Sequence, residues 1–215
     1  MKLKSFFALA LIPQILLVSF IKNNPSIIDD YYSDYLYVNI LKINSFIYSN
    51  INIPIGEILY IILFVVIIYL VYKVFSFKLN ELVNLTAFIS IVYFIFYSFW
   101  GLNYFKTSIS YKLNIKNNYE FIELDNTLNF IISKINDEVP LLQDFNQLDF
   151  FELTNMTNLN VKRSIVPSYL LLQTISGHFI PFTSESVINF DIPKINLPVV
   201  IFHEYAHQMG YADEA

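Results

Sequence analysis

The sequence contains no cysteine, which excludes disulfide bonds and thiolate metal ligands. Charged residues are scarce as well: they make up 14% of the 215 residues, against about 25% in an ordinary soluble domain. The few basic side chains are scattered along a chain of net charge -5 and form no stripe of the kind that binds nucleic acid. We therefore expect no nucleic-acid partner. Apolar residues make up 55% of the chain.

Long apolar runs are concentrated in the first half of the chain. They predict three membrane-spanning helices near 5–21, 58–77 and 82–105, because about 20 residues at 1.5 Å each cross the hydrocarbon core. Residues 1–105 are thus expected to form a transmembrane anchor region in contact with the lipid bilayer. Three buried helices of a soluble core are the alternative, which the lack of polar faces in the second and third runs disfavours.

Basic residues near the runs suggest an orientation. With three spans, Lys2 and Lys4 share one side of the membrane with Lys73 and Lys78, and this density of lysine favours the cytoplasm. The second half of the chain is then extracytoplasmic, so we expect a multi-pass protein of the cell membrane whose second domain faces outward.

The segment between the first two runs has apolar residues at helical spacing, at Leu36, Ile40, Ile43 and Ile47. This pattern predicts a helix between residues 26 and 54. The helix either lies on the membrane surface or packs against the second domain.

Residues 106–215 mix helix and strand signals, which indicates a small α+β domain. A helix is expected near 125–136, a short strand at Val187–Phe190 and a further helix from Pro198 to Met209. Proline suits the first turn of that last helix, and Gly210 suits its C-terminal cap.

The last helix carries the most informative motif, His203-Glu204-Tyr205-Ala206-His207. Histidines at positions i and i+4 share one helix face, where both imidazoles can bind one zinc ion. Glu204 is rotated by about 100° from them, which in zinc peptidases of this spacing lets the carboxylate reach the activated water. The alternative is a pair of histidines that cap or pack on a core helix.

This motif predicts a chemistry. Zinc lowers the pKa of a bound water toward about 7 and polarises the carbonyl group of the substrate. Glu204 takes the proton of that water and passes it to the leaving amine. We therefore expect a membrane-anchored zinc metallopeptidase that hydrolyses peptide bonds in a peptide or protein substrate. The alternative function is a non-catalytic membrane protein with a structural or sensing metal site.

A catalytic zinc ion normally has three protein ligands, and the motif supplies two. Glu214 is the candidate for the third, and Asp213 is the other candidate, three residues after Gly210. Ordinary solvated carboxylates at both positions are the alternative. Because an ordered domain seldom stops within its own active site, we expect the domain to continue past residue 215.

Two more residues precede the motif. His178 can stabilise a tetrahedral intermediate or can simply lie at the edge of the core. Glu185 precedes the expected strand Val187–Phe190, which is a candidate for the sheet edge that pairs with an extended substrate.

Several segments together resemble an uncharacterised family of bacterial membrane proteins of unknown function that carries a zinc-peptidase motif. They are Asp30–Ser33, Ile53–Glu57, Phe99–Tyr104, Pro181–Glu185, and His203-Glu204 with Ala206-His207-Gln208 and Gly210. The resemblance implies a multi-span anchor followed by a zincin-like (gluzincin-like) domain. It also implies metal binding by His203 and His207 and the base role of Glu204.

Overall fold

The computed structural model describes residues 2–75, 78–112, 114, 120–138, 161–166, 175–193 and 196–212. The chain forms two compact units, one of residues 1–106 with 159–215 and one of residues 107–158. The expected boundary at residue 105 rests on hydropathy and stays a prediction, because the contacts join the C-terminal segment to the first 106 residues.

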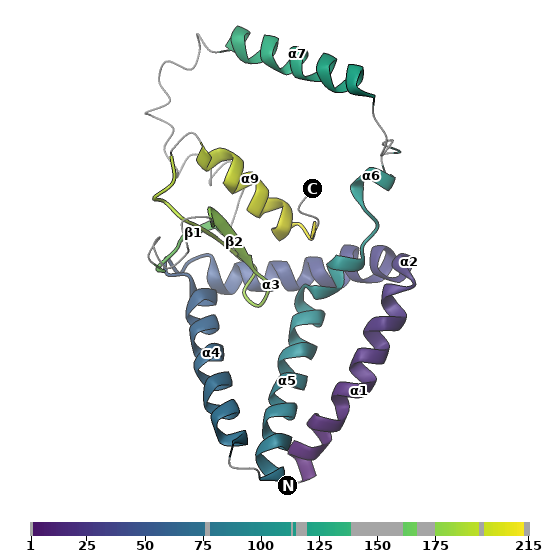
Figure 1. Cartoon of the computed structure of the whole chain (residues 1–215), viewed down its shortest axis with the longest axis vertical. Coiled ribbons are helices and arrows are strands. Elements are labelled where there is room, and N and C mark those ends of the chain that lie inside the picture. The colour runs from purple at the N-terminus through teal and green to yellow at the C-terminus, as the bar shows by residue number, and fades with distance from the viewer. Residues whose placement is uncertain are drawn as a thin grey trace. The chain divides into compact units, whose positions relative to one another are not determined.

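Three apolar helices dominate the first unit (Figure 1): α1 (Lys2–Lys22), α4 (Ile55–Val74) and α5 (Leu79–Phe99). Each is long and apolar enough to cross a membrane, which confirms three membrane-capable helices in the expected region. Most of their large apolar side chains are not covered by other parts of the protein, as a lipid-facing surface requires.

The third helix is shorter than expected. It ends at Phe99, where Trp100 leaves the helical conformation with φ −156° and ψ −35°, and a 3-10 turn, η2 (Gly101–Phe105), follows. A Cβ at position 101 would lie 2.6 Å from the Phe96 ring, so any other residue here would force that ring to move. The expected span to residue 105 was therefore too long, because an uncharged composition does not reveal where a helix turns.

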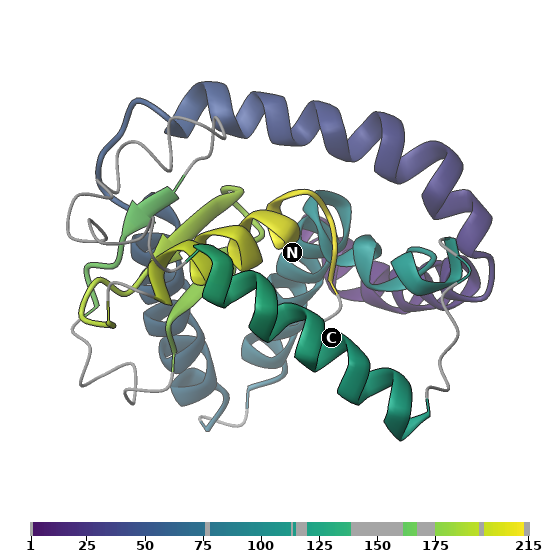
Figure 2. The ribbon, with the colours of Figure 1, turned by 90° about the horizontal axis from the view of Figure 1, so that it is seen from above.

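A helical segment connects the first two spans and consists of α2 (Pro25–Ile27), η1 (Ile28–Tyr37, a π-helix) and α3 (Val38–Tyr48). Figure 2 shows η1 and α3 as one long run beside the sheet. Its inner face buries Asn44, whose amide donates to Ser184 Oγ at 2.9 Å. This confirms the expected helix between residues 26 and 54.

The C-terminal part of the unit contains a small sheet of three strands: β1 (Val161–Arg163), β2 (Gly177–Ile180) and β3 (Glu185–Ile188). The order is β1-β3-β2, with β1 parallel and β2 antiparallel to β3. The strand expected at Val187–Phe190 corresponds to β3, but the expectation that it forms the sheet edge is wrong. β3 is the central strand, and all four of its residues are buried. Among the described strands, β2 forms the edge beside the last helix.

That last helix is α9 (Leu197–Gln208), which packs against β2 and β3 and confirms the expected helix. It ends in a Schellman turn: Tyr211 N–H donates to Ala206 C=O and Gly210 N–H to His207 C=O, both at 3.0 Å. Gly210 has φ +83°, a conformation that side chains rarely adopt.

The second unit contains α6 (Ile109–Lys112) and α7 (Phe121–Glu138). The helix expected near residues 125–136 is therefore confirmed as part of α7.

A buried carboxylate joins the sheet to the membrane region. Glu185 accepts hydrogen bonds from the first backbone N–H groups of α4, at 3.2 Å from Ile55 and 2.5 Å from Gly56. The ammonium group of Lys162 on β1 contacts the same carboxylate and also donates to the carbonyls of Tyr48 and Ile53. A negative charge at a helix N-terminus is favourable, and here both charges are also fully hydrogen-bonded.

Replacing Lys162 by Met should therefore lower the stability of the protein by about 3–5 kcal/mol, because it leaves the buried Glu185 carboxylate without its cation. Thermal unfolding in detergent measures the loss. The matched control is Arg163→Met, which breaks an exposed pair with Asp191 at 3.9 Å and should change little. Equal losses in the two variants would contradict this role of Lys162.

Candidate metal centre

The two motif histidines converge on one point. His203 and His207 lie one turn apart on α9, and their Nε2 atoms are 3.1 Å from each other. Two nitrogens on a tetrahedral zinc ion, at 2.0–2.1 Å each, lie about 3.3 Å apart. The structure therefore brings the two expected ligands into chelating distance.

The tautomer of His207 also suits a metal ligand. Its Nδ1 lies 2.7 Å from the carbonyl oxygen of Tyr211, which can only accept, so Nδ1 carries the proton. The Nε2 atom of neutral His207 is then left with its lone pair, directed toward His203. The Gly210 turn creates this contact by folding the chain back beside the ring.

Neighbouring elements hold the last two turns of α9 by their backbone carbonyls. Trp100 Nε1 donates to His207 C=O at 3.0 Å, and Tyr37 donates to Gln208 C=O at 2.5 Å. Burial raises the pKa of Tyr37 above its ordinary value, so its hydroxyl keeps the proton that it donates. Ser186 on β3 donates to Glu204 C=O at 3.2 Å. These bonds fix the helix, and with it the histidine pair.

The 3-10 turn after α5 thereby gains a physical reason. Trp100 leaves α5 and bonds to α9, and Asn103 lies against Gly210, with its Oδ1 3.0 Å from where a Cβ on that glycine would lie. Asn103 is buried, and within the described residues its side-chain amide has no hydrogen-bond partner. The resemblance included Phe99–Tyr104 without a role for it, because these contacts join segments more than a hundred residues apart.

Glu204 is 3% exposed and lies against the backbone of β2. A Cβ added to Gly177 would be 2.9 Å from Glu204 Oε1 and 2.9 Å from Val200 Cγ1. The absence of a side chain at Gly177 therefore makes room for the carboxylate beside the edge strand.

A cavity of about 360 Å³ opens at these residues. Its wall combines the motif with the edge strand and with aromatic residues of α4, α5 and η2. It is lined by Tyr60, Phe96, Trp100, Tyr104, Gly177, His178, Phe179, Pro181, His203, Glu204 and His207.

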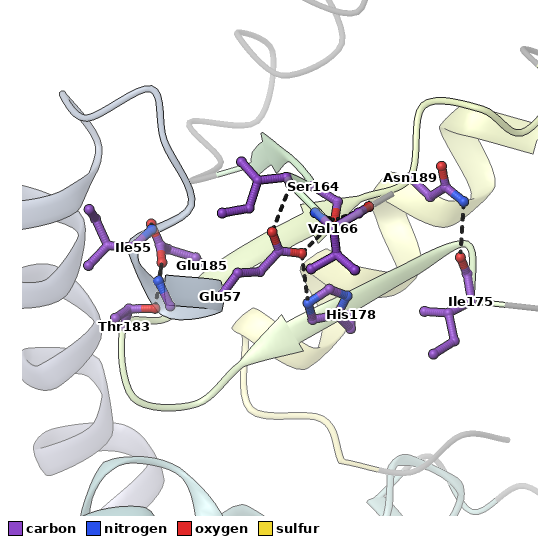
Figure 3. A network of polar contacts seen from close by, with 11 residues as sticks. Ile55, Glu57, Ser164, Val166, Ile175, His178, Thr183, Glu185 and Asn189 are labelled. Carbon is purple, nitrogen blue, oxygen red and sulfur yellow. Dashed lines mark hydrogen bonds and ion pairs between the residues drawn. The ribbon is translucent and has the colours of Figure 1, made fainter. Parts of the chain in front are cut away.

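His178 belongs to this cavity and not merely to the core edge. Its Nε2 lies 3.5 Å from Glu57 Oε1 (Figure 3). Glu57 is buried and also accepts from Ser164 Oγ at 2.5 Å and from the backbone N–H of Ile165 at 2.8 Å. Burial lowers the pKa of His178 from its ordinary value, and the nearby Glu57 raises it in part.

The role of Glu57 escaped sequence reasoning, which named it only as the end of the segment Ile53–Glu57 before the second span. Glu57 and Ile165 are 108 positions apart, and no local pattern links them. The third-ligand candidates Asp213 and Glu214 lie outside the described residues. Within the described part of the chain, no cluster of three His, Asp or Glu side chains suited to a metal is found, so the third ligand stays a prediction.

Comparison with protein families places residues 32–215 in DUF3810, a family described as of unknown function. The chain belongs to this family. The matched region includes every residue of the cavity wall as well as Glu57 and Tyr37, and it confirms the resemblance to an uncharacterised family. No curated protein and no solved structure matches the chain.

The DUF3810 protein contains three histidines, so imidazole NMR signals can be assigned with single variants. In metal-free protein, the pKa of His178 should lie below the usual value of about 6.5, because burial disfavours its charged form. Glu57→Gln should lower it further by removing a nearby negative charge. Glu81→Gln, which changes a carboxylate at the opposite end of the spanning helices, should leave it unchanged.

The same shift affects stability. Burial lowers the pKa of His178 in the folded state, so protonation of this residue favours the unfolded chain. The contribution of His178 to the free energy of unfolding is therefore complete above about pH 6.5 and is lost as the pH falls through the folded-state pKa. A His178 pKa at or above 6.5, or one that Glu57→Gln does not move, would contradict this arrangement.

Proposed function

We propose that this DUF3810 protein is a membrane-anchored zinc metallopeptidase, with His203 and His207 as zinc ligands and Glu204 as the catalytic acid–base. The observation that carries the proposal is the 3.1 Å separation of the two Nε2 atoms beside a buried glutamate in one cavity. An ordinary pair of core histidines needs neither a shared focus nor a neighbouring carboxylate.

The donor set fits zinc. Two imidazoles converge, and the Tyr211 carbonyl fixes the tautomer of His207 in the form that binds a cation. Glu214 is proposed as the third ligand, with Asp213 as the alternative. When bound, zinc supplies Lewis-acid chemistry, lowering the pKa of water and polarising a carbonyl group.

The proton steps belong to Glu204. Its carboxylate accepts the proton of the attacking water and passes it to the nitrogen of the leaving amine. Its position is constrained from two sides: Gly177 leaves room for its side chain, and Ser186 holds its carbonyl oxygen. Burial away from bulk water helps to keep this proton within the site.

The edge strand β2 suits an extended peptide. Asn189 N–H donates to Ser176 C=O at 2.9 Å, and alternate positions along β2 therefore pair with β3. By this alternation, the N–H and C=O groups of Gly177 and Phe179 face the outer edge, where both residues line the cavity. A substrate strand added there would present its carbonyl group beside the histidine pair.

His178 is proposed as the residue that contacts the carbonyl oxygen of the substrate as negative charge develops on it. It lines the cavity on β2, and Glu57 positions its ring from behind. A side chain held in place before the reaction can stabilise charge without reorganisation.

The orientation is proposed from the basic ends of the helices. Lys4 lies in the first turn of α1, Lys73 in the last turn of α4, and Lys78 directly before α5. These helix ends lie away from α9 and the sheet (Figure 1). With this lysine-rich end in the cytoplasm, the cavity is extracytoplasmic and the protein is multi-pass in the cell membrane.

The decisive experiment is peptide hydrolysis by Glu204→Gln, which keeps the size of the side chain and removes its base. Activity should fall by about 10²–10⁴-fold, while zinc content stays unchanged. Glu123→Gln, on the exposed face of α7, is the matched control and should retain full activity. Undiminished hydrolysis in Glu204→Gln would sink the mechanism.

The same experiment separates the alternative function, a non-catalytic protein with a structural or sensing metal site. His207 is buried, and Trp100 bonds to its backbone carbonyl, so the histidine pair lies where α9 meets the end of α5. That function requires bound zinc, no hydrolysis by the unaltered chain and unfolding of the sheet region on chelation.

A second prediction concerns His178. His178→Ala should lower kcat by about 10²-fold with little change in KM or zinc content, as the loss of one oxyanion donor does. Glu57→Gln should have a smaller effect and should also move the acidic limb of the pH–rate profile. If both variants change only KM, His178 binds substrate without stabilising the developing charge.

A further inference from the structure

The wall of the cavity coincides with the membrane interface. Tyr60 lies five residues into α4, about 7–8 Å from its start, and Phe96 lies three residues before the end of α5. Trp100 comes directly after α5, and Tyr104 lies on η2. Aromatic side chains at the ends of spanning helices lie at the level of the lipid headgroups, and these four side chains also line the cavity.

The helical segment formed by η1 and α3 also suits the level of the lipid headgroups. The segment formed by η1 and α3 exposes large apolar side chains, with Phe46 83% exposed and Leu36, Ile43 and Ile47 about half exposed. Another side of the helix is attached to the sheet, because the buried Asn44 bonds to Ser184 in the turn between β2 and β3. A helix with one apolar face directed away from the protein suits the headgroup boundary, so the sheet is held close to the bilayer.

We infer that the substrate is a polypeptide segment at the membrane surface, anchored in the same bilayer within a few residues of the scissile bond. This inference rests on the proposed peptidase function and specifies its substrate class. The segment extends along the outer edge of β2, and an apolar side chain next to the scissile bond occupies the aromatic part of the cavity.

The cavity itself favours this occupant. Its volume of about 360 Å³ is in the range of small-ligand sites, and the membrane helices contribute only aromatic side chains to it. The polar groups, His178, His203, Glu204 and His207, come from β2 and α9. A peptide that reaches these groups therefore passes beside the interfacial aromatic residues, which a folded soluble domain cannot do without unfolding at its surface.

The test uses the full chain, loaded with zinc, in phosphatidylcholine–phosphatidylglycerol vesicles. Three fluorogenic peptides share one cleavage sequence. The first is joined to a dipalmitoyl anchor by about three residues, and the second by about ten prolines, which hold it roughly 30 Å above the surface. The third has no anchor. Equal surface density of the two anchored peptides removes the effect of local concentration.

We expect the peptide with the short spacer to be cleaved at least roughly tenfold faster than the one on the proline spacer, and faster than the free peptide. Glu204→Gln provides the blank. Equal or faster cleavage of the raised or free peptide overturns the inference and leaves the peptidase proposal standing. No cleavage of any peptide by zinc-loaded protein overturns both.

Discussion

The buried carboxylate of Glu185 is the interaction on which the rest of the first unit depends. It receives the first N–H groups of the spanning helix α4, the hydroxyl of Thr183 at 2.7 Å and the ammonium group of Lys162. The helices α3 and α4 and the sheet meet at this point, because Lys162 on β1 also bonds to carbonyls at the end of α3 and before α4. Each charged group has hydrogen-bond partners, and these bonds compensate the cost of removing the pair from water.

From this point the positions of the candidate site follow. Glu185 begins β3, whose Ser186 donates a hydrogen bond to the carbonyl of Glu204 on α9. The turn before it bonds to Gln208, since Ser184 C=O accepts from the amide of that residue at 2.8 Å. On the far side, Tyr37 and Trp100 bond to the last turn of α9. The histidine pair is thus fixed between a sheet and the ends of membrane helices, which supplies the rigidity that a metal site needs.

The sequence predicted the elements that local physics determines. The His203–His207 pair, the helix that carries it and the Gly210 cap depend on spacing and backbone conformation within a dozen residues, and the structure has all of them. The apolar runs likewise predicted the three long helices.

Long-range contacts set the features that the sequence could not supply. The end of α5 at Phe99 depends on the bond of Trp100 to α9, and an apolar composition carries no sign of it. β3 was expected at the edge of the sheet but is its central strand, because β1 pairs with its other side. The link between Glu57 and His178 joins a membrane helix to a strand, and neither residue has a local pattern that identifies the other.

The central claim is that His203 and His207 bind one metal ion. X-ray absorption at the zinc edge, on the purified protein given one equivalent of zinc, tests it most directly. The account predicts two imidazole nitrogens at about 2.0–2.1 Å, with that shell lost in His207→Ala and kept in His178→Ala. A zinc shell without imidazole, or the same shell in His207→Ala, would contradict it.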